Sequence, residues 1–433
     1  MRKPYIVVSC PADTFSGYGA RSRDVLLALI KNNKYDVQVM SQRWGNTPFG
    51  FLKEDNPKHK SIKDRFLPNN QLTRQPDVWI QITVPNEFQK VGKYNIGITA
   101  GIETSFCAAQ WIEGLNRMDL NLVSSQHSKK VFETTNYEKK DQQGNTQQII
   151  KLEKPVDVLF EGVDVEKYFT IDKFSKSDIK TSLDSIKEDF GFLFVGHWLQ
   201  GHLGEDRKNL GLTIKTFLDS FKNKKGKKPA LILKTALGPS SIMNKDEILK
   251  RIDAIKRMVG GKNLPNIYLI HGDLTDEEMN ILYNHPKVKT LVNLAKGEGF
   301  GRPLLEFSQS RKPIIASNWS GHLDFLHPNY TSLVPGEIKP IHPSAQVKDM
   351  LMEGSQWFQF DIDYTIKLFK DYFKNYKTYV TRNRKLKKHC KENFSFDKMV
   401  DVIENIIDKN APKQVEIKIP KIQKISKPTK PKK

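Results

Sequence analysis

Cysteine is scarce in this sequence, and its placement excludes two common ways of stabilising a chain. The 433 residues include three cysteines, Cys10, Cys107 and Cys390, which are far apart. No CxxC pair and no Cys/His cluster occurs, so the sequence predicts neither a disulfide framework nor a zinc site. An odd, sparse count is typical of a reducing compartment, and we expect no metal centre.

Long apolar runs are also missing. No stretch approaches the roughly 18 consecutive apolar residues that span a bilayer, so the sequence predicts no transmembrane segment. The chain begins with charge and then the apolar run 5–8, but Cys10-Pro11 and Asp13 end that run too early for a signal-peptide core. We interpret it as a first buried strand in a cytoplasmic protein.

Two nucleotide-binding signatures are incomplete or absent. The glycine-rich stretch 17–22 lacks the third glycine of GxGxxG, and no acidic residue clearly ends the second expected strand. Both features argue against a nicotinamide dehydrogenase. The P-loop pattern GxxxxGK[ST] does not occur, which excludes a P-loop NTPase.

Acidic residues are outnumbered by basic ones, 49 against 70, and the formal net charge is +21. The segment 410–433 holds eight lysines and one glutamate, and the remaining chain still carries +14. A basic surface favours phosphate-bearing partners such as nucleic acid, anionic lipid or nucleotide sugars. A Lys- and Asn-rich composition explains the charge equally well, because no RNA- or DNA-binding motif accompanies it.

Apolar runs alternate with helical patterns in two successive parts of the chain, which predicts parallel sheets covered on both sides. The first part has expected helices at 20–32 and 128–133, and a polar segment, 136–154, that we interpret as an exposed insertion. Its expected strands are 5–9, 36–40, 78–83, 94–99, 120–124 and 156–160. The second part has expected helices at 210–222 and 246–258, and its expected strands are 190–196, 230–235, 267–271, 290–294 and 313–317.

These patterns predict an α/β fold of two Rossmann-like, doubly wound domains that face a cleft. We place the domains at residues 1–175 and 186–392, with a closing helix at 393–411 and a disordered Lys/Pro-rich tail at 412–433. Helical patterns at 364–392 and 396–408 end the folded part. Open α/β sheets bind ligands at the carboxyl ends of their strands, so the cleft is the expected site.

The segment Gly297-Glu298-Gly299-Phe300-Gly301-Arg302-Pro303-Leu304-Leu305-Glu306 carries the most chemical information. It follows an expected strand and precedes a helix that Pro303 opens, a residue suited to a first helical turn. Glycines there let the backbone approach a ligand, and a helix start offers N–H groups to phosphate. Two glutamates eight residues apart, Glu298 and Glu306, are placed to hold two sets of hydroxyls on one nucleotide sugar.

This segment resembles the signature of glycosyltransferase family 4, retaining enzymes of the GT-B fold that use no metal. Four other segments resemble that family in the expected order. They are Ser16-Gly17-Tyr18-Gly19, Gly101-Ile102-Glu103-Thr104, Arg207-Lys208-Asn209 and His271-Gly272-Asp273-Leu274. We also hypothesise a closer kinship with glycosyltransferases of tailed phages, which would place the protein in the host cytoplasm.

The resemblance implies a role for each matching position. Arg207 and Lys208 would neutralise the donor diphosphate, which is a good leaving group only when fixed cations meet its charge. Glu298 would contact the transferred sugar, and Glu306 the ribose hydroxyls. The remaining donor-binding positions implied are Gly17, Gly19, Gly272, Asp273, Gly299, Phe300, Gly301, Arg302, Pro303 and Leu304. Near Gly101 the sequence departs from the family, because Glu103 stands where many members have a histidine; Glu103 and Thr104 are candidate sugar or acceptor contacts.

The predicted function is therefore a retaining hexosyl- or pentosyltransferase with a nucleotide-diphosphate sugar, favoured as a UDP-sugar, as cosubstrate and no metal cofactor. The favoured acceptor is a DNA base that carries a hydroxymethyl-type group, bound through the basic surface and tail. Lys and Arg at 382–388 are the candidate phosphate contacts. Lipid, glycan or protein acceptors are the alternatives within this class. A non-catalytic nucleic-acid-binding protein is the alternative from a different class, and it gives no reason for Glu298 and Glu306.

Overall fold

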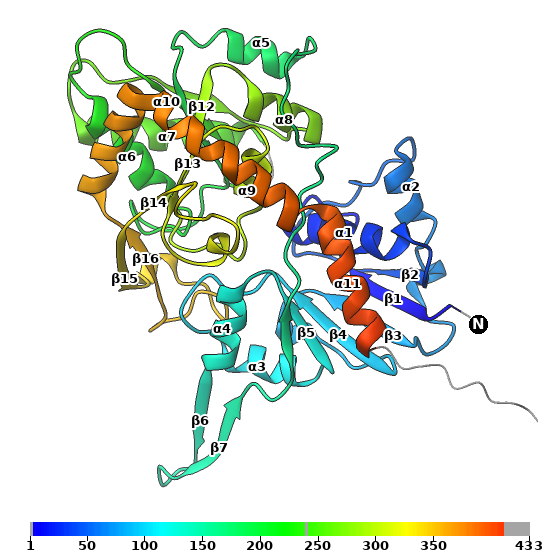
Figure 1. Ribbon diagram of the computed structural model, residues 1–433. Coiled ribbons are helices and arrows are strands. Elements are labelled where there is room, and N and C mark those ends of the chain that lie inside the picture. Colours follow the sequence, from blue (N-terminus) through cyan, green and yellow to red (C-terminus); the bar gives the residue numbers. More distant parts are fainter. Residues whose placement is uncertain (1–2, 239–240, 411–433) are drawn as a thin grey trace, which may run out of the picture.

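Two six-stranded parallel sheets, one in each half of the chain, organise the molecule (Figure 1). The structure is a computed structural model, and it describes residues 3–238 and 241–410. Strands within both sheets, such as Tyr5–Cys10, Val78–Ile82 and Ala230–Lys234, are apolar runs that are buried along nearly their whole length, as expected when helices cover both faces. The predicted pair of doubly wound α/β units is confirmed. The predicted tail at 412–433 lies outside the described residues.

The N-terminal sheet has the strand order β2-β1-β3-β4-β5-β8. Apolar residues on its two faces form separate cores under the covering helices. The strands are β1 (Tyr5–Cys10), β2 (Asp36–Ser41), β3 (Val78–Ile82), β4 (Tyr94–Thr99), β5 (Leu120–Val123) and β8 (Val156–Val158). The helices are α1 (Gly17–Lys31), α2 (Pro57–Lys63), α3 (Ala109–Asn116) and α4 (Gln126–Thr134).

The C-terminal sheet has the order β11-β10-β9-β12-β13-β14. Its strands are β9 (Gly191–Val195), β10 (Ala230–Lys234), β11 (Ile267–Ile270), β12 (Val288–Asn293), β13 (Ile314–Ser317) and β14 (Ser332–Val334). Its helices are α5 (Asp178–Asp184), α6 (Leu210–Phe221), α7 (Ile242–Val259), α8 (Asp276–Asn284) and α9 (Arg302–Ser308). The strand order reverses between β9 and β12, and such a switch point is where open α/β sheets bind ligands.

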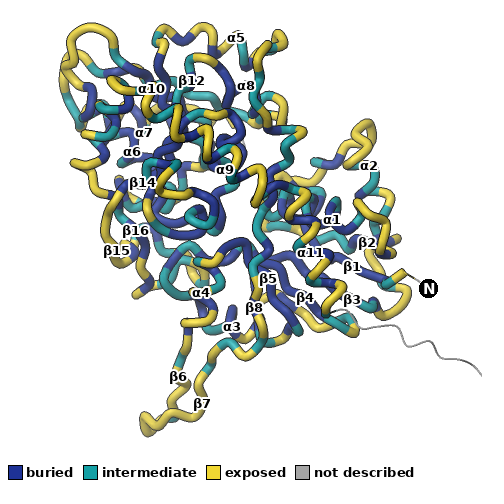
Figure 2. Tube along the Cα trace, in the orientation of Figure 1, coloured by how far each residue is buried: buried dark blue, intermediate teal, exposed yellow. Residues whose placement is uncertain are grey.

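Two antiparallel hairpins and four short 3₁₀ turns complete the described fold. The hairpin β6 (Asn136–Lys140) and β7 (Thr146–Lys151) extends away from α3 and α4 and is exposed along most of its length (Figure 2). The predicted exposed insertion is thus a two-stranded arm. The second hairpin is β15 (Gly336–Pro340) and β16 (Gln356–Phe360), and the turns are η1 (Pro68–Asn70), η2 (Pro85–Glu87), η3 (Gly321–Asp324) and η4 (Pro343–Ala345).

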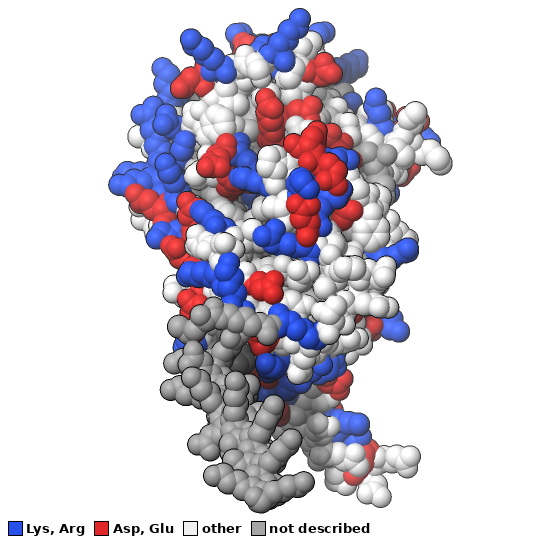
Figure 3. Space-filling view, turned by 90° about the vertical axis from the view of Figure 1, so that its right-hand side faces the viewer, with Lys and Arg blue, Asp and Glu red and all other residues white. Residues whose placement is uncertain are grey.

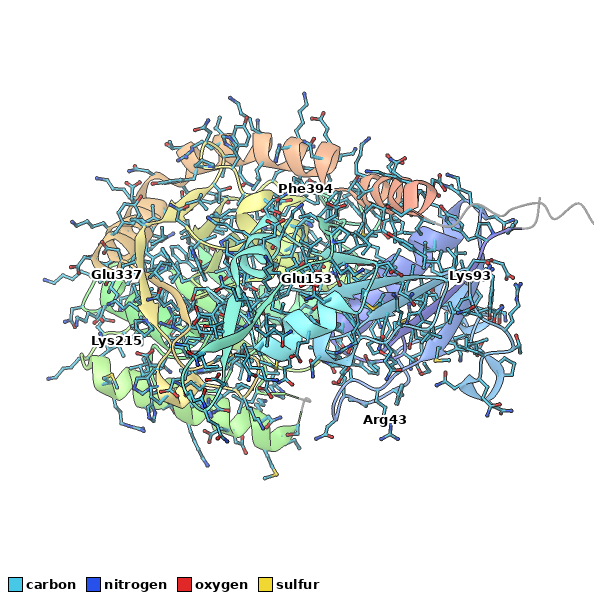
Figure 4. The ribbon with its side chains drawn as sticks, turned by 90° about the horizontal axis from the view of Figure 1, so that it is seen from below. Arg43, Lys93, Glu153, Lys215, Glu337 and Phe394 are labelled. Atoms are coloured by element: carbon cyan, nitrogen blue, oxygen red, sulfur yellow. The ribbon has the colours of Figure 1, made fainter. Side chains whose placement is uncertain are left out.

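The chain passes between the halves at two points that lie side by side. Val163 donates its N–H to Phe394 O at 2.9 Å, and Phe396 N–H bonds to Val163 O at 2.8 Å. Before the second crossing, α10 (Ile362–Asn393) packs on the C-terminal half. After it, α11 (Phe396–Asn410) packs against α1 of the N-terminal half (Figure 1). Figure 4 shows Phe394 at this crossing and Arg43 on the opposite side of the molecule.

Helix starts follow the expected capping chemistry. Ser16, Ser125, Ser177 and Ser241 each accept a backbone N–H at the N-cap of a helix. Asp361 does the same for α10, where its carboxylate accepts the Tyr364 N–H at 2.9 Å. Among the described residues, none of the helices has the length and apolar character that crossing a membrane requires.

Candidate functional site

Four charged side chains from both halves meet where the two sheets face each other. The Lys208 ammonium donates to both Glu298 carboxylate oxygens, at 2.6 and 2.7 Å. Arg207 Nη1 lies 3.2 Å from Glu103 Oε1 and 3.7 Å from Glu298 Oε2. Arg207 and Lys208 follow β9, Glu298 follows β12, and Glu103 follows β4 of the other sheet. The structure therefore brings together the predicted cation pair, one predicted glutamate and the residue that departs from the family pattern.

Glu298 is held as an ionised group. It is buried, which favours the neutral acid, but Lys208 and Arg207 lower its pKa to about 2. Asn293 Nδ2 donates to Glu298 Oε1 at 2.9 Å, and the Glu298 backbone N–H bonds to Ser320 Oγ at 2.9 Å. Burial lowers the pKa of Lys208 against the opposing pull of Glu298. The arrangement provides fixed cations beside a fixed carboxylate.

The glycines of this turn allow the two halves to touch. A Cβ on Gly297 would lie 2.1 Å from Glu103 O, and a Cβ on Gly299 would lie 2.6 Å from Ala100 O. Any side chain at either position would separate the loop after β12 from the loop after β4. Ser124 Oγ donates across the same contact to Gly299 O at 3.3 Å. The backbone in this turn is therefore shaped by close approach between the halves.

Glu306 lies one helical turn into α9 and has two partners. Arg302 Nε donates to its Oε1 at 2.9 Å, and the Tyr283 hydroxyl donates to Oε2 at 3.2 Å. Burial raises the pKa of Glu306 to about 7, and the Arg302 charge opposes that rise. Arg302 also pairs with Asp24 of α1, in the other half.

The other residues implied by the resemblance are in different environments. Gly17 and Gly272 border open space, and Asp273 is exposed. Gly19 instead fits against the β1–α1 loop, because a Cβ there would be 2.4 Å from Thr14 O. Five further residues serve the protein interior or the helix. Phe300 and Leu304 are buried in the core, and Thr104 donates to Phe106 O. Gly301 has φ +95° at the N-cap of α9, and Pro303 lies in the first turn of that helix.

A cavity of about 1060 Å³ is lined by residues of both halves, among them Arg302, the partner of Glu306. Its lining includes Ser16 and Asp24 on the N-terminal side, and Asp273, Leu274 and Arg302 on the C-terminal side. It therefore joins the turn after β11, which the resemblance assigned to the nucleotide base, to the arginine that holds Glu306. Figure 3 shows Asp and Glu side chains gathered in the upper half of the face that it presents, with Lys and Arg side chains among and around them.

Several supporting residues escaped sequence reasoning. Asn293, Tyr283 and Asp24 contact predicted site residues but come from a strand end and two helix faces with no motif around them. The loop 197–206 carries two histidines, and neither forms a hydrogen bond or ion pair with the four-residue cluster. His197 Nδ1 lies 3.3 Å from Ala236 O, and the His202 ring packs against the His342 ring. All three cysteines are buried and free, and within 3–238 and 241–410 no group of three or more His, Cys, Asp or Glu could hold a metal ion.

Comparison with known proteins identifies the fold. No family model and no curated protein matches the chain. The solved structures it resembles include sucrose-phosphate synthase from Thermosynechococcus elongatus, at 12% identity and a TM-score of 0.60 over 94% of this chain and 99% of the other. A glycosyltransferase from Rickettsia africae matches at 11% identity and 0.59, over 94% and 99%. HepE from Anabaena, in complex with UDP-glucose, matches at 13% and 0.55, over 94% and 100%.

Similarity at this level of identity shows architecture, and it extends over nearly the whole chain. Together with the two six-stranded parallel sheets and the returning C-terminal helices, it establishes the GT-B fold that the sequence predicted. These similar structures are described as a sucrose-phosphate synthase, a glycosyltransferase and a complex with UDP-glucose.

Proposed function

We propose that this protein is a glycosyltransferase that takes a sugar from a nucleotide-diphosphate donor, with UDP-sugars as the favoured donors. The observation that supports this most is the Glu103–Arg207–Glu298–Lys208 cluster at the switch point of a GT-B fold. In our proposal Arg207 and Lys208 exchange their carboxylate partners for the donor diphosphate. As the bond between the anomeric carbon and the diphosphate oxygen breaks, the two cations meet the charge that develops on that oxygen.

The carboxylates have complementary roles in the proposal. Glu298, ionised and held by Asn293, faces the transferred sugar and accepts from its hydroxyls. Glu306 accepts from the ribose. The acceptor hydroxyl replaces the diphosphate on the anomeric carbon with retention, and its proton leaves with the nucleotide. The proposal includes no metal cofactor, because the side chains that meet the diphosphate are cationic themselves.

Turnover of Arg207→Ala tests the assignment. We expect a loss of about 100-fold or more, as for other preorganised contacts to a developing charge, with the fold intact. Nucleotide release from UDP- and GDP-sugars is measured by mass spectrometry with and without EDTA, and EDTA should leave it unchanged. Lys250→Ala, an exposed change on α7, is the control. Wild-type turnover by Arg207→Ala at saturating donor would contradict the role.

We propose a hydroxymethylated or similarly modified DNA base as acceptor, on the strength of the net charge. The enzyme would extrude such a base from the duplex or act on single strands. The run 382–388 lies on α10, which has ten Lys or Arg against three acidic residues. Part of this run has local partners, since Arg382 donates to Pro328 O and Lys388 pairs with Glu392.

Salt dependence tests the DNA acceptor. Duplex binding should weaken steeply with salt, with a log–log slope of about −0.9 for each phosphate neutralised. Replacing Arg384, Lys385 and Lys388 by Gln should flatten that slope without changing donor hydrolysis. If DNA does not bind at low salt, or if no modified DNA accepts a sugar, the DNA acceptor is contradicted and lipid, glycan or protein acceptors are favoured. DNA binding without turnover on any acceptor would favour a non-catalytic nucleic-acid-binding protein.

A further inference from the structure

Arg302 is held from both sides, by one residue of each half of the molecule. Its Nε donates to Glu306 Oε1 at 2.9 Å within α9, and its Nη1 pairs with Asp24 Oδ2 of α1. The side chains of Asp24 and Glu306 are 16% and 10% exposed and that of Arg302 is 30% exposed, so both contacts are partly shielded from water. Charge-assisted bonds of this kind are stronger than exposed surface pairs.

The chain Asp24–Arg302–Glu306 thus crosses the boundary between the halves and ends on the carboxylate proposed to hold the ribose. Asp24 and Arg302 both line the 1060 Å³ cavity beside the site. Other contacts between the halves near the site involve loops: Gly297 and Gly299 lie in the loop after β12, and Arg207, in the loop after β9, pairs with Glu103. The Asp24 contact instead reaches the helix that carries Glu306.

The surroundings of Glu306 make its charge depend on Arg302. The groups that face it are Arg302 on its own helix, Tyr283 and Asp276 on α8, and Tyr168 on the connecting segment, while Asp24 and Glu161 face Arg302 itself. Arg302 is the cation that contacts Glu306, and Arg21 and Arg23 of α1 are the further cations near Asp24 and Arg302. An ionised carboxylate accepts hydrogen bonds at both oxygens, whereas a protonated one has to donate from one of them.

We propose that Asp24 is a positioning residue for donor binding: it fixes Arg302 across the boundary, so that Glu306 is charged and oriented for the ribose when the two halves are closed. The inference rests on the proposed function, because it concerns the ribose site of a nucleotide donor. By linkage, bound nucleotide should stabilise the contact between the halves as much as that contact stabilises bound nucleotide.

Asp24→Asn tests the inference by removing the charge while keeping the shape. We expect the Kd for UDP and the KM for a UDP-sugar to rise about 10-fold or more, the range for losing a charged hydrogen bond. The kcat at saturating donor should change less than KM. Without a fixed Arg302, Glu306 protonates more easily, so UDP affinity should be lost at a higher pH than in the wild type. Asp24→Glu should restore most of the affinity.

Asp324→Asn is the matched control. Asp324 also bridges the halves, accepting the Gln126 N–H at 2.9 Å, but it contacts neither Arg302 nor Glu306. The Asp324→Asn variant should therefore leave the Kd for UDP and its pH profile unchanged. The double variant Asp24→Asn/Arg302→Gln should cost no more than Arg302→Gln alone, since both changes break one chain of contacts.

The outcomes separate this inference from the proposed function. If the wild-type protein binds no nucleoside diphosphate, the proposed function fails. If it binds UDP and Asp24→Asn binds equally well with the same pH profile, the positioning role fails and the function stands. Equal weakening by Asp24→Asn and Asp324→Asn would mean that closure in general matters, and it would overturn the specific role. If Asp24→Asn does not fold, two other measurements decide. One is the pH profile of Asp24→Glu. The other compares the double variant Asp24→Ser/Arg302→Gln with Arg302→Gln alone.

Discussion

Lys296 stands beside the candidate site as a buried ammonium with a specific set of partners. Its side chain is 2% exposed, its Nζ donates to Gln359 Oε1 at 2.5 Å, and it lies 5.2 Å from the centre of the Trp357 ring. Its backbone N–H bonds to Arg207 O at 2.8 Å. Burial lowers its pKa to about 8, against the opposing charges of Glu205 and Asp206. The residue therefore connects the cation-bearing loop to the second hairpin.

Lys296→Met should change how stability varies with pH. In the wild type the folded protein releases this proton near pH 8 and the unfolded chain near 10.5, so between these values the unfolded state binds more protons. The free energy of unfolding should therefore gain on the order of 3 kcal/mol from this group as pH rises through that window. Lys296→Met should lack this gain. Urea unfolding at pH 7.5 and 9.5 measures it, with exposed Lys262→Met as control; identical pH dependence in wild type and Lys296→Met would contradict the assignment.

At the scale of elements, the main sheets and long helices follow from the sequence, because their apolar patterns are strong. The expected strand 94–99 coincides with β4, and the expected helix 210–222 with α6 (Leu210–Phe221). The sequence analysis predicts neither α5 nor β15. Helix α5 lies between the two predicted domains, and β15 is exposed at all five positions. Contacts between segments that are distant in the sequence were also not predicted, because no local pattern indicates, for example, that Asp24 pairs with Arg302.

The candidate site shows the same limit. Arg207, Lys208, Glu298 and Glu306 were predicted because a family motif marks them. The structure adds that Glu103 pairs with Arg207, which the sequence did not predict, and that Phe300 packs against Phe325 in the core. Side chains inside a motif can thus serve packing, and only the three-dimensional contacts separate them from those that face a ligand.

The β6–β7 arm should be dispensable for folding. Its strands contact the body mainly through Tyr137, whose hydroxyl donates to Cys107 O, and through Ile150. Replacing residues 139–148 by Asn-Gly joins Glu138 to Ile149 in the existing register and provides a favoured two-residue turn. We expect the free energy of unfolding to change by about 0.5 kcal/mol or less, as for surface changes. Tyr137→Ala in the full-length protein, which removes the anchor, should cost more; a large loss from the shortened arm would show a structural role for its tip.

At the scale of the whole molecule, the C-terminal helix makes the N-terminal half depend on the end of the described chain. After the chain has formed the C-terminal half, α11 crosses back and places Met399, Val400, Ile403 and Ile407 in the core that lies against β1 and α1. Lys34 and Asn32 bind Glu404 of α11 at 2.6 and 2.7 Å and fix its register. The N-terminal half therefore completes its core only when the chain has passed through the other half.

Ile403→Ala should consequently weaken the N-terminal half and leave the C-terminal half nearly unchanged. Ile403 is 1% exposed, and truncating a buried Ile to Ala typically costs about 2–5 kcal/mol through lost burial and the cavity left behind. Calorimetry should show a lower melting temperature for the part of the transition that involves the N-terminal half. Hydrogen exchange should show faster opening of β1 and α1, with β9 and β12 protected as in the wild type. Asn405→Ala, exposed on the same helix, should change neither. Equal loss of protection in both sheets would mean that the two halves unfold as one cooperative unit, and the dependence would then be mutual.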